Sequence, residues 1–219
     1  MKFALRYAGP FYTAALRSGV ATVCLFGVMF LLRRDLRLRA PLPVLLVSML
    51  QGAFIALTLW ALSLGGVGRV AVLNFTMPFW VVLLAWPVLG ERVRGTQWVA
   101  VAVAFAGLLC VAQPWELGDK FASGVLGICS GFSWSLATIM VKRHRNALQA
   151  MDTLGLTAWQ LLCGTLPLLL LAWIVPERAA SWTPQFWAAI AYLGVVGTAL
   201  AWLLWTFAIT KLPASVASL

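Results

Sequence analysis

The polar side chains within the apolar stretches of this chain are amides, hydroxyls, indoles and one arginine, rather than acids or imidazoles. No Asp, Glu or His lies deep in such a stretch, so neither the paired acids of a hydrolase nor the His ligands of a metal site are present there. No phosphate-binding loop of the Walker type occurs. Four cysteines lack CxxC spacing: Cys24, Cys110, Cys129 and Cys163. We therefore predict a protein that is not an enzyme and has no catalytic residue, metal site or cofactor.

Asn74 and Pro78 lie four residues apart in one apolar stretch, and so on the same face of a helix. Pro78 removes one helical hydrogen bond and clashes with the preceding turn, which predicts a kink near the centre of the membrane. An amide deep in lipid is costly unless it is partnered or faces a cavity. Asn74 is therefore a candidate for lining a substrate pathway, and the alternative is a hydrogen bond between helices.

A second candidate is a polar and aromatic stripe formed by Ser130, Trp134 and Thr138 at i, i+4 and i+8. Beside it lie small residues that would let another helix approach closely, namely Gly124, Gly127 and Gly131. Trp134 either lines a cavity or serves as a packing or interfacial aromatic residue. The same two interpretations apply to Trp60, Trp80, Trp159, Gln160, Thr198, Trp202 and Trp205.

Arg17 stands about two turns inside the first apolar stretch. At that depth its side chain can reach the membrane surface and act as an anchor. The alternative is a contact with the substrate or with a gate. Both interpretations stay open from the sequence alone.

The composition predicts a chain that lies mostly in lipid. Hydrophobic residues make up 63% of the 219 positions, charged residues make up 10%, and the mean hydropathy is +0.95. Soluble domains are about half apolar and about a quarter charged. Apolar stretches long enough to cross a bilayer as helices recur seven times, at 11–32, 43–64, 70–89, 96–112, 121–141, 153–174 and 186–209.

The positive charges lie between these stretches and predict their orientation. Ten Lys and Arg fall on one side and five on the other, with Arg17 inside a span. The positive-inside rule makes the richer side cytoplasmic, so we expect cytoplasmic loops around 33–39, 91–95, 142–152 and 210–213 of a multi-pass protein in the cell (inner) membrane. The net charge of +10 is thereby interpreted as a topology signal rather than as a nucleic-acid surface.

An internal repeat adds to this pattern, because residues 61–73 and 208–219 share one form: a helix ending in Ala-aliphatic-hydroxyl, a Gly or Pro turn, then small residues. Together with the motifs around it, the repeat resembles the EamA-type transporters of the drug/metabolite transporter superfamily. In the first half the resemblance lies in Gly9, Pro10, Leu16, Arg17, Pro78, Leu89, Gly90, Glu91, Gln97, Trp98 and Gly107. In the second half it lies in Gly124, Gly127, Trp134, Arg143, Gly197, Thr198, Ala199, Leu212, Pro213, Ala214 and Ser215.

The resemblance implies an all-α integral membrane protein with ten helices arranged as two inverted five-helix repeats, of which about seven helices are visible here. Residues 1–113 then form a first repeat without its first helix, and residues 114–219 a second repeat without its last two. From this mapping we expect a chain truncated at both ends and unable to transport by itself.

The function implied is that of a permease, an exporter of small metabolites or amino acids that works by alternating access between the two repeats. Its partners would be a small-molecule substrate and the lipid bilayer, without nucleic acid, and a homodimer is left open. The alternative is a seven-helix sensor or interaction protein that moves nothing. The substrate-pathway candidates are Asn74, Pro78, Trp134, Ser130, Thr138, Trp60, Thr198, Trp202 and Arg17.

Overall fold

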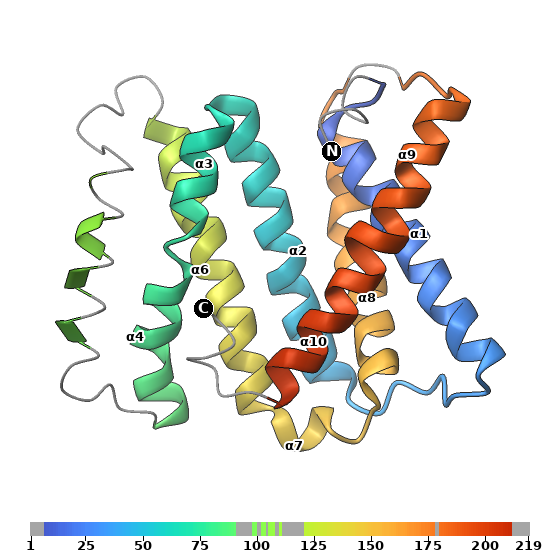
Figure 1. Ribbon diagram of the computed structural model, residues 1–219, viewed down its shortest axis with the longest axis horizontal. Coiled ribbons are helices and arrows are strands. Elements are labelled where there is room, and N and C mark those ends of the chain that lie inside the picture. The colour runs from blue at the N-terminus through green and yellow to red at the C-terminus, as the bar shows by residue number, and fades with distance from the viewer. Residues whose placement is uncertain are drawn as a thin grey trace.

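The apolar stretches form helices, because a backbone in lipid must satisfy its hydrogen bonds within its own segment. The computed structural model describes residues 7–90, 98–99, 102–103, 105–107, 110, 121–177 and 180–211, and this part contains helices and no strand. Six spans in it are long and apolar enough to cross a membrane (Figure 1). The predicted all-α membrane fold is confirmed. The span predicted at 96–112 falls mainly outside the described residues.

Three of the spans are single helices near the middle and one side of the bundle: α1 (Pro10–Leu31), α2 (Pro41–Leu64) and α8 (Thr153–Ile174). On the other side lie α3 (Val67–Asn74), α4 (Met77–Leu89) and α6 (Phe121–Arg143), and the one-turn helix α7 (Arg145–Leu148) leads from α6 towards α8. Helix α2 packs between α6 and α8, while α1 packs on α8 and α4 packs on α6. The last span consists of α9 (Pro184–Gly194), η4 (Val195–Leu200) and α10 (Ala201–Lys211), and α10 reaches both α8 and α6 (Figure 1).

Helices α2 and α8 approach each other closely at Gly52 of α2. A Cβ atom built there would lie 2.7 Å from the ring of Pro167 and 3.0 Å from the carbonyl oxygen of Gly164, both on α8. Such small residues allow helices to come into backbone contact in lipid. Gly52 therefore sets the spacing of α2 and α8, directly beside Gln51.

The start of α1 is capped by a side chain from far along the sequence. The carboxylate of Glu177 accepts hydrogen bonds from the backbone N–H groups of Phe11, at 2.8 Å, and Tyr12, at 3.0 Å. These N–H groups have no partner within the helix, and a negative charge beside them is also favoured by the helix dipole. The segment after α8 is thereby tied to the entrance of α1.

We expect Glu177→Ala to destabilise the protein by about 1–2 kcal/mol, the usual contribution of a charged hydrogen-bonding cap. Thermal unfolding in detergent measures this, with Gln185→Ala as the control, because Gln185 is exposed at the start of α9. Equal unfolding temperatures for the two variants would show that the cap contributes nothing.

The span that contains Pro78 is broken rather than kinked, which corrects the prediction. Helix α3 ends at Asn74 and α4 begins at Met77, so Pro78 falls in the first turn of α4. There the N–H group that proline lacks would have no helical partner in any case, and its fixed φ suits a helix start. The break packs on Gly131 of α6, where a Cβ atom would lie 2.7 Å from the hydroxyl oxygen of Thr76.

The last span also departs from a regular α-helix, because residues Val195–Leu200 form a π-helix. The hydroxyl of Thr198 donates to the carbonyl oxygen of Leu193, five residues earlier, at 2.9 Å. Such π segments are rare and often mark functional sites. The span thus has a widened turn immediately before α10.

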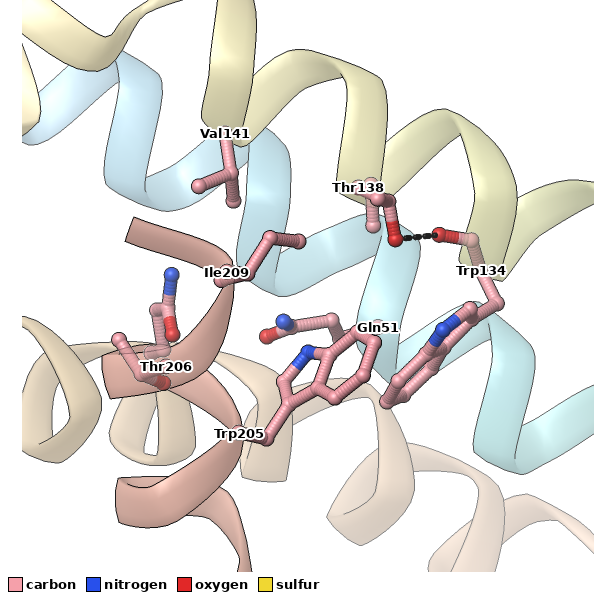
Figure 2. A pocket seen from close by; sticks show the side chains of 9 residues that line it. Gln51, Trp134, Thr138, Val141, Trp205, Thr206 and Ile209 are labelled. Carbon is pink, nitrogen blue, oxygen red and sulfur yellow. Dashed lines mark hydrogen bonds between the residues drawn. The ribbon is translucent and has the colours of Figure 1, made fainter. Parts of the chain in front are cut away.

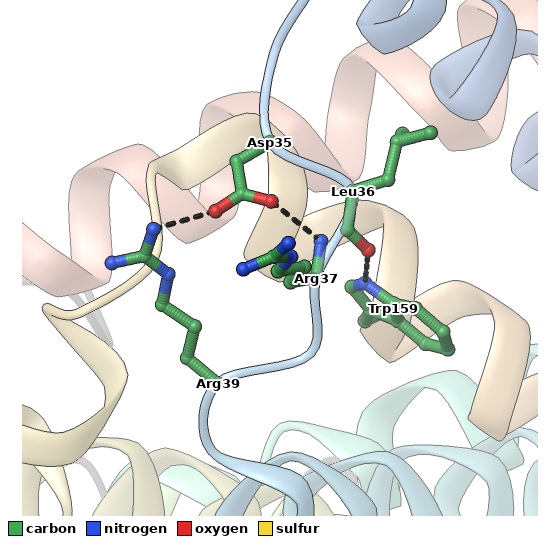
Figure 3. Close-up of polar contacts among 5 residues, drawn as sticks. All are labelled: Asp35, Leu36, Arg37, Arg39 and Trp159. Carbon is green, nitrogen blue, oxygen red and sulfur yellow. Dashed lines mark hydrogen bonds and ion pairs between the residues drawn. The ribbon is translucent and has the colours of Figure 1, made fainter.

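The loop between α1 and α2 is held by side-chain contacts of its own (Figure 3). Asp35 forms an ion pair with Arg39 and accepts a hydrogen bond from the backbone N–H of Arg37 at 3.0 Å. The indole N–H of Trp159, on α8, donates to the carbonyl oxygen of Leu36 at 3.1 Å. Trp159 therefore attaches this loop to α8.

Asp35 is expected to stabilise the loop only while it is ionised. The hydrogen bond from Arg39, followed by the backbone N–H of Arg37, lowers the pKa of Asp35 below its ordinary value. The stability it contributes is therefore present above the pKa of an unfolded aspartate, about 3.9, and is lost as the pH falls through the lower folded value. The small difference in unfolding temperature between wild type and Asp35→Asn should shrink below about pH 4. A difference that widens there would contradict this.

Candidate functional site

Three indole side chains meet at the junction of α6 and α10. The ring of Trp134, on α6, lies 5.2 Å from that of Trp202 and 5.2 Å from that of Trp205, centroid to centroid. Phe54, on α2, packs against the same indole at 4.7 Å. Aromatic groups at these distances attract one another beyond the effect of burial alone. The result is an aromatic wall to which α2, α6 and α10 all contribute.

Three polar side chains from three helices face the same junction: Gln51 of α2, Gln160 of α8 and Thr206 of α10. Their exposed fractions are 7%, 3% and 2%. Among the described residues, neither the amide oxygen of Gln160 nor the hydroxyl oxygen of Thr206 has a hydrogen-bond partner. A buried polar atom without a partner costs about 1–3 kcal/mol. A cost of this kind in two side chains that line the same pocket calls for an explanation.

We call these groups the central cluster: Gln51, Trp134, Ala137, Thr138, Val141, Gln160, Trp205, Thr206 and Ile209 line one pocket (Figure 2). None of the nine carries a charge. Their side chains fill the pocket so closely that no water molecule fits between them. Figure 2 shows Gln51 and Trp205 among the lining side chains, with Thr138 donating to the carbonyl oxygen of Trp134 at 3.0 Å.

One end of the central cluster adjoins a wider cavity of about 290 Å³. Val141 and Ile209 line both spaces, so these two aliphatic side chains separate them. The wider cavity contains charged groups, from Lys142, Arg145 and Asp152. A charged outer space therefore leads to an uncharged inner one across an apolar boundary.

The structure brings only some of the predicted pathway residues to this place. Trp134 and Thr138 belong to the central cluster, and Trp202 packs against Trp134. Trp60 lies outside the central cluster and is 45% exposed on α2. Pro78 lies at the α3/α4 break.

Asn74 and Ser130 form a separate polar contact at that break. The amide nitrogen of Asn74 donates to the hydroxyl of Thr58 on α2 at 3.3 Å, and its amide oxygen accepts from Ser130 on α6. Asn74 thus joins three elements through hydrogen bonds between helices. A part for Asn74 and Ser130 in the substrate pathway stays a prediction.

Arg17 makes its side-chain hydrogen bond inside the helix bundle. Its guanidinium donates to the hydroxyl of Thr198 in the π-helix at 3.1 Å. Its Nε atom is buried and has no hydrogen-bond partner among the described residues. The side chain therefore joins α1 to the irregular turn of the last span, and its role in gating stays a prediction.

Gln51 and Thr206 are the residues of this candidate site that sequence reasoning missed. Each is a polar residue inside an apolar stretch, the signal that singled out Asn74. Thr hydroxyls commonly bond to their own helix, as Thr157 does to Thr153, so most give no functional signal. Only the packing of α2, α8 and α10 shows that these two face Gln160.

Comparison with known proteins decides the family. The chain matches the EamA-like transporter family over residues 1–113 and 122–219. This protein belongs to the EamA-like transporter family. It is similar to an uncharacterised transporter of Bacillus subtilis, YoaV, at 24% identity over 227 residues, which cover 100% of this chain and 76% of that protein. A riboflavin transporter of Rhizobium johnstonii is 31% identical over 121 residues, covering 54% of this chain and 40% of its own length.

The fold also agrees with a solved crystal structure, which superposes with a TM-score of 0.73 at 18% identity and covers 95% of this chain and 73% of that one. This EamA-like protein is therefore a membrane transporter, and its family and relatives indicate transport rather than enzymatic activity. The family membership further implies a small-molecule substrate.

Proposed function

We propose that this EamA-like transporter is a permease that exports small metabolites, amino acids included, and binds them at the central cluster. The observation that carries the proposal is the pair of unpartnered buried atoms on Gln160 and Thr206. A solute that donates to one and pairs with the other would relieve their cost. Substrate sites of inverted-repeat transporters lie near the membrane midplane between the halves.

Movement would follow alternating access between two inverted repeats, residues 1–113 and 114–219. The central cluster includes α2 from the first and α6, α8 and α10 from the second. It is closed in this structure. A solute would enter when the movement between the repeats also draws α10 away from α6, both of which belong to the second repeat. The π-helix before α10 and the break between α3 and α4 supply irregular backbone at which such a motion can hinge.

We further propose that the loops around 33–39, 91–95, 142–152 and 210–213 face the cytoplasm and that the membrane is the cell (inner) membrane. Positive charges concentrated in these loops support this orientation. The cavity lined by Lys142 and Arg145 would then be the cytoplasmic entrance. Residues 91–97 and 212–219 lie outside the described part of the chain.

The test is a metabolite export screen. Because the 219-residue chain alone is expected not to transport, the test uses the protein expressed together with any coding sequence that flanks this chain in its gene. Cells that express this wild type and cells that express its Trp134→Ala variant at equal membrane levels are compared by mass spectrometry of the medium. We expect at least one small metabolite to accumulate outside with the wild type and to fall to the level of empty cells with the variant. Equal export by both would show that the central cluster is not part of the transport pathway. If no solute is exported at all, the proposal that the protein is a permease is wrong.

A further inference from the structure

We infer that the central cluster selects uncharged, planar solutes that carry a primary amide or a similar edge with both a donor and an acceptor. This inference rests on the proposed function of the cluster as the substrate site. It narrows the proposed solutes to uncharged ones and so excludes free amino acids, which are zwitterions at neutral pH. Three features of the lining support it.

The first feature is the aromatic wall. The indoles of Trp134 and Trp205 both line the pocket, and Trp202 backs Trp134. Flat π surfaces gain most from a flat partner in an offset or edge-on arrangement. When α10 moves from α6, the gap that opens lies between Trp134 and Trp205. A planar ring fits that gap and replaces the contact that the two indoles lose.

The second feature is the absence of charge from the nine lining residues. A carboxylate or an ammonium group moved into such a place loses its hydration with nothing to compensate. The charged groups of the outer cavity lie beyond Val141 and Ile209. They can attract a charged solute but cannot pair with it once it reaches the cluster.

The third feature is the set of hydrogen-bonding atoms. The Gln160 amide oxygen can only accept, so the solute must donate to it. The Thr206 hydroxyl donates and accepts, and the Gln51 amide offers both kinds of atom. A primary amide presents a donor and an acceptor side by side and so satisfies Gln160 and Thr206 together. A hydrocarbon ring would leave both atoms unpaired.

The test compares nicotinamide with nicotinate, two planar pyridines that differ only in an amide against a carboxylate. Calorimetric titration of the purified protein in lipid nanodiscs, corrected with empty nanodiscs, gives both dissociation constants at neutral pH, where nicotinate is ionised. We expect nicotinamide to bind at least ten-fold more tightly. Equal affinity, tighter binding of nicotinate, or binding of neither would overturn the inference.

A matched pair of variants locates the binding. Thr206→Val removes the unpartnered hydroxyl of the cluster, and Thr157→Val removes a hydroxyl that bonds to its own helix on α8. We expect Thr206→Val to weaken nicotinamide binding about ten-fold and Thr157→Val to leave it unchanged. If both probes bind equally and Thr206→Val weakens both, the cluster is a substrate site and only the solute class is wrong. If nicotinamide is preferred but Thr206→Val has no effect, the preference arises elsewhere and the inference fails.

Discussion

Gln160→Leu is expected to lower export by at least ten-fold while the protein stays folded. Leucine has nearly the size of glutamine, so it preserves the packing of α8 against α2. It leaves a buried donor of the solute without its acceptor, which costs about 1–3 kcal/mol, and about 1.4 kcal/mol corresponds to a factor of ten. Initial rates for a solute found in the export screen, at equal membrane levels, measure the loss.

For the stability of the same variant we do not expect a loss, in contrast to its transport rate. Because the amide oxygen of Gln160 is buried without a partner among the described residues, its removal should leave the unfolding temperature unchanged or raise it. A core glutamine that served only as structure would give the reverse, a lower unfolding temperature with unchanged specific transport. Gln185→Leu, at an exposed position of α9, should change neither the rate nor the stability.

Gly52→Leu should prevent the protein from folding. Even a Cβ atom at this position would meet the Pro167 ring at 2.7 Å and a backbone oxygen of Gly164 at 3.0 Å, and the oxygen cannot move without α8. Overpacking of this kind costs about 1–3 kcal/mol for small additions and more for a whole isobutyl group. We expect loss of the monodisperse peak in size-exclusion chromatography, with Gly52→Ala intermediate.

The control for this prediction is Gly27→Leu on α1, since a Cβ atom at Gly27 has no atom within 4 Å among the described residues. It should elute as the wild type does. A monodisperse, active Gly52→Leu protein would show that α2 and α8 are farther apart than in this structure, and the position of Gln51 opposite Gln160 would then be wrong.

The fold could be predicted because length and hydropathy alone define a span. Stretches such as 43–64 and 153–174 have one physical solution in lipid, and the structure gives α2 and α8 there. The break between α3 and α4 was harder to predict from the sequence. Pro78 is equally compatible with a kink and with a helix start. The break packs on Gly131 of α6, a helix that is far away in the sequence, and this contact cannot be read from the residues around Pro78.

The site could be predicted only where one helix carries several of its members. Trp134 and Thr138 are a turn apart on α6, so helical spacing identified them. Gln51, Gln160 and Thr206 come from three helices, and their meeting depends on which faces pack together. Arg17 illustrates the same limit, because its partner Thr198 lies 181 residues away. Helical periodicity contains no information about such a pairing.

The most direct test of the central claim is the accessibility of Thr206 from water. In a protein whose native cysteines are replaced by serine, namely Cys24, Cys110, Cys129 and Cys163, Thr206→Cys introduces a thiol at a position that is 2% exposed here. We predict that a membrane-impermeant maleimide labels it in intact membranes, from one face at a time, and that an exported solute slows the labelling. A thiol that reacts only after the protein is unfolded would show that the cluster never opens to solvent, and the transport pathway described here would be wrong.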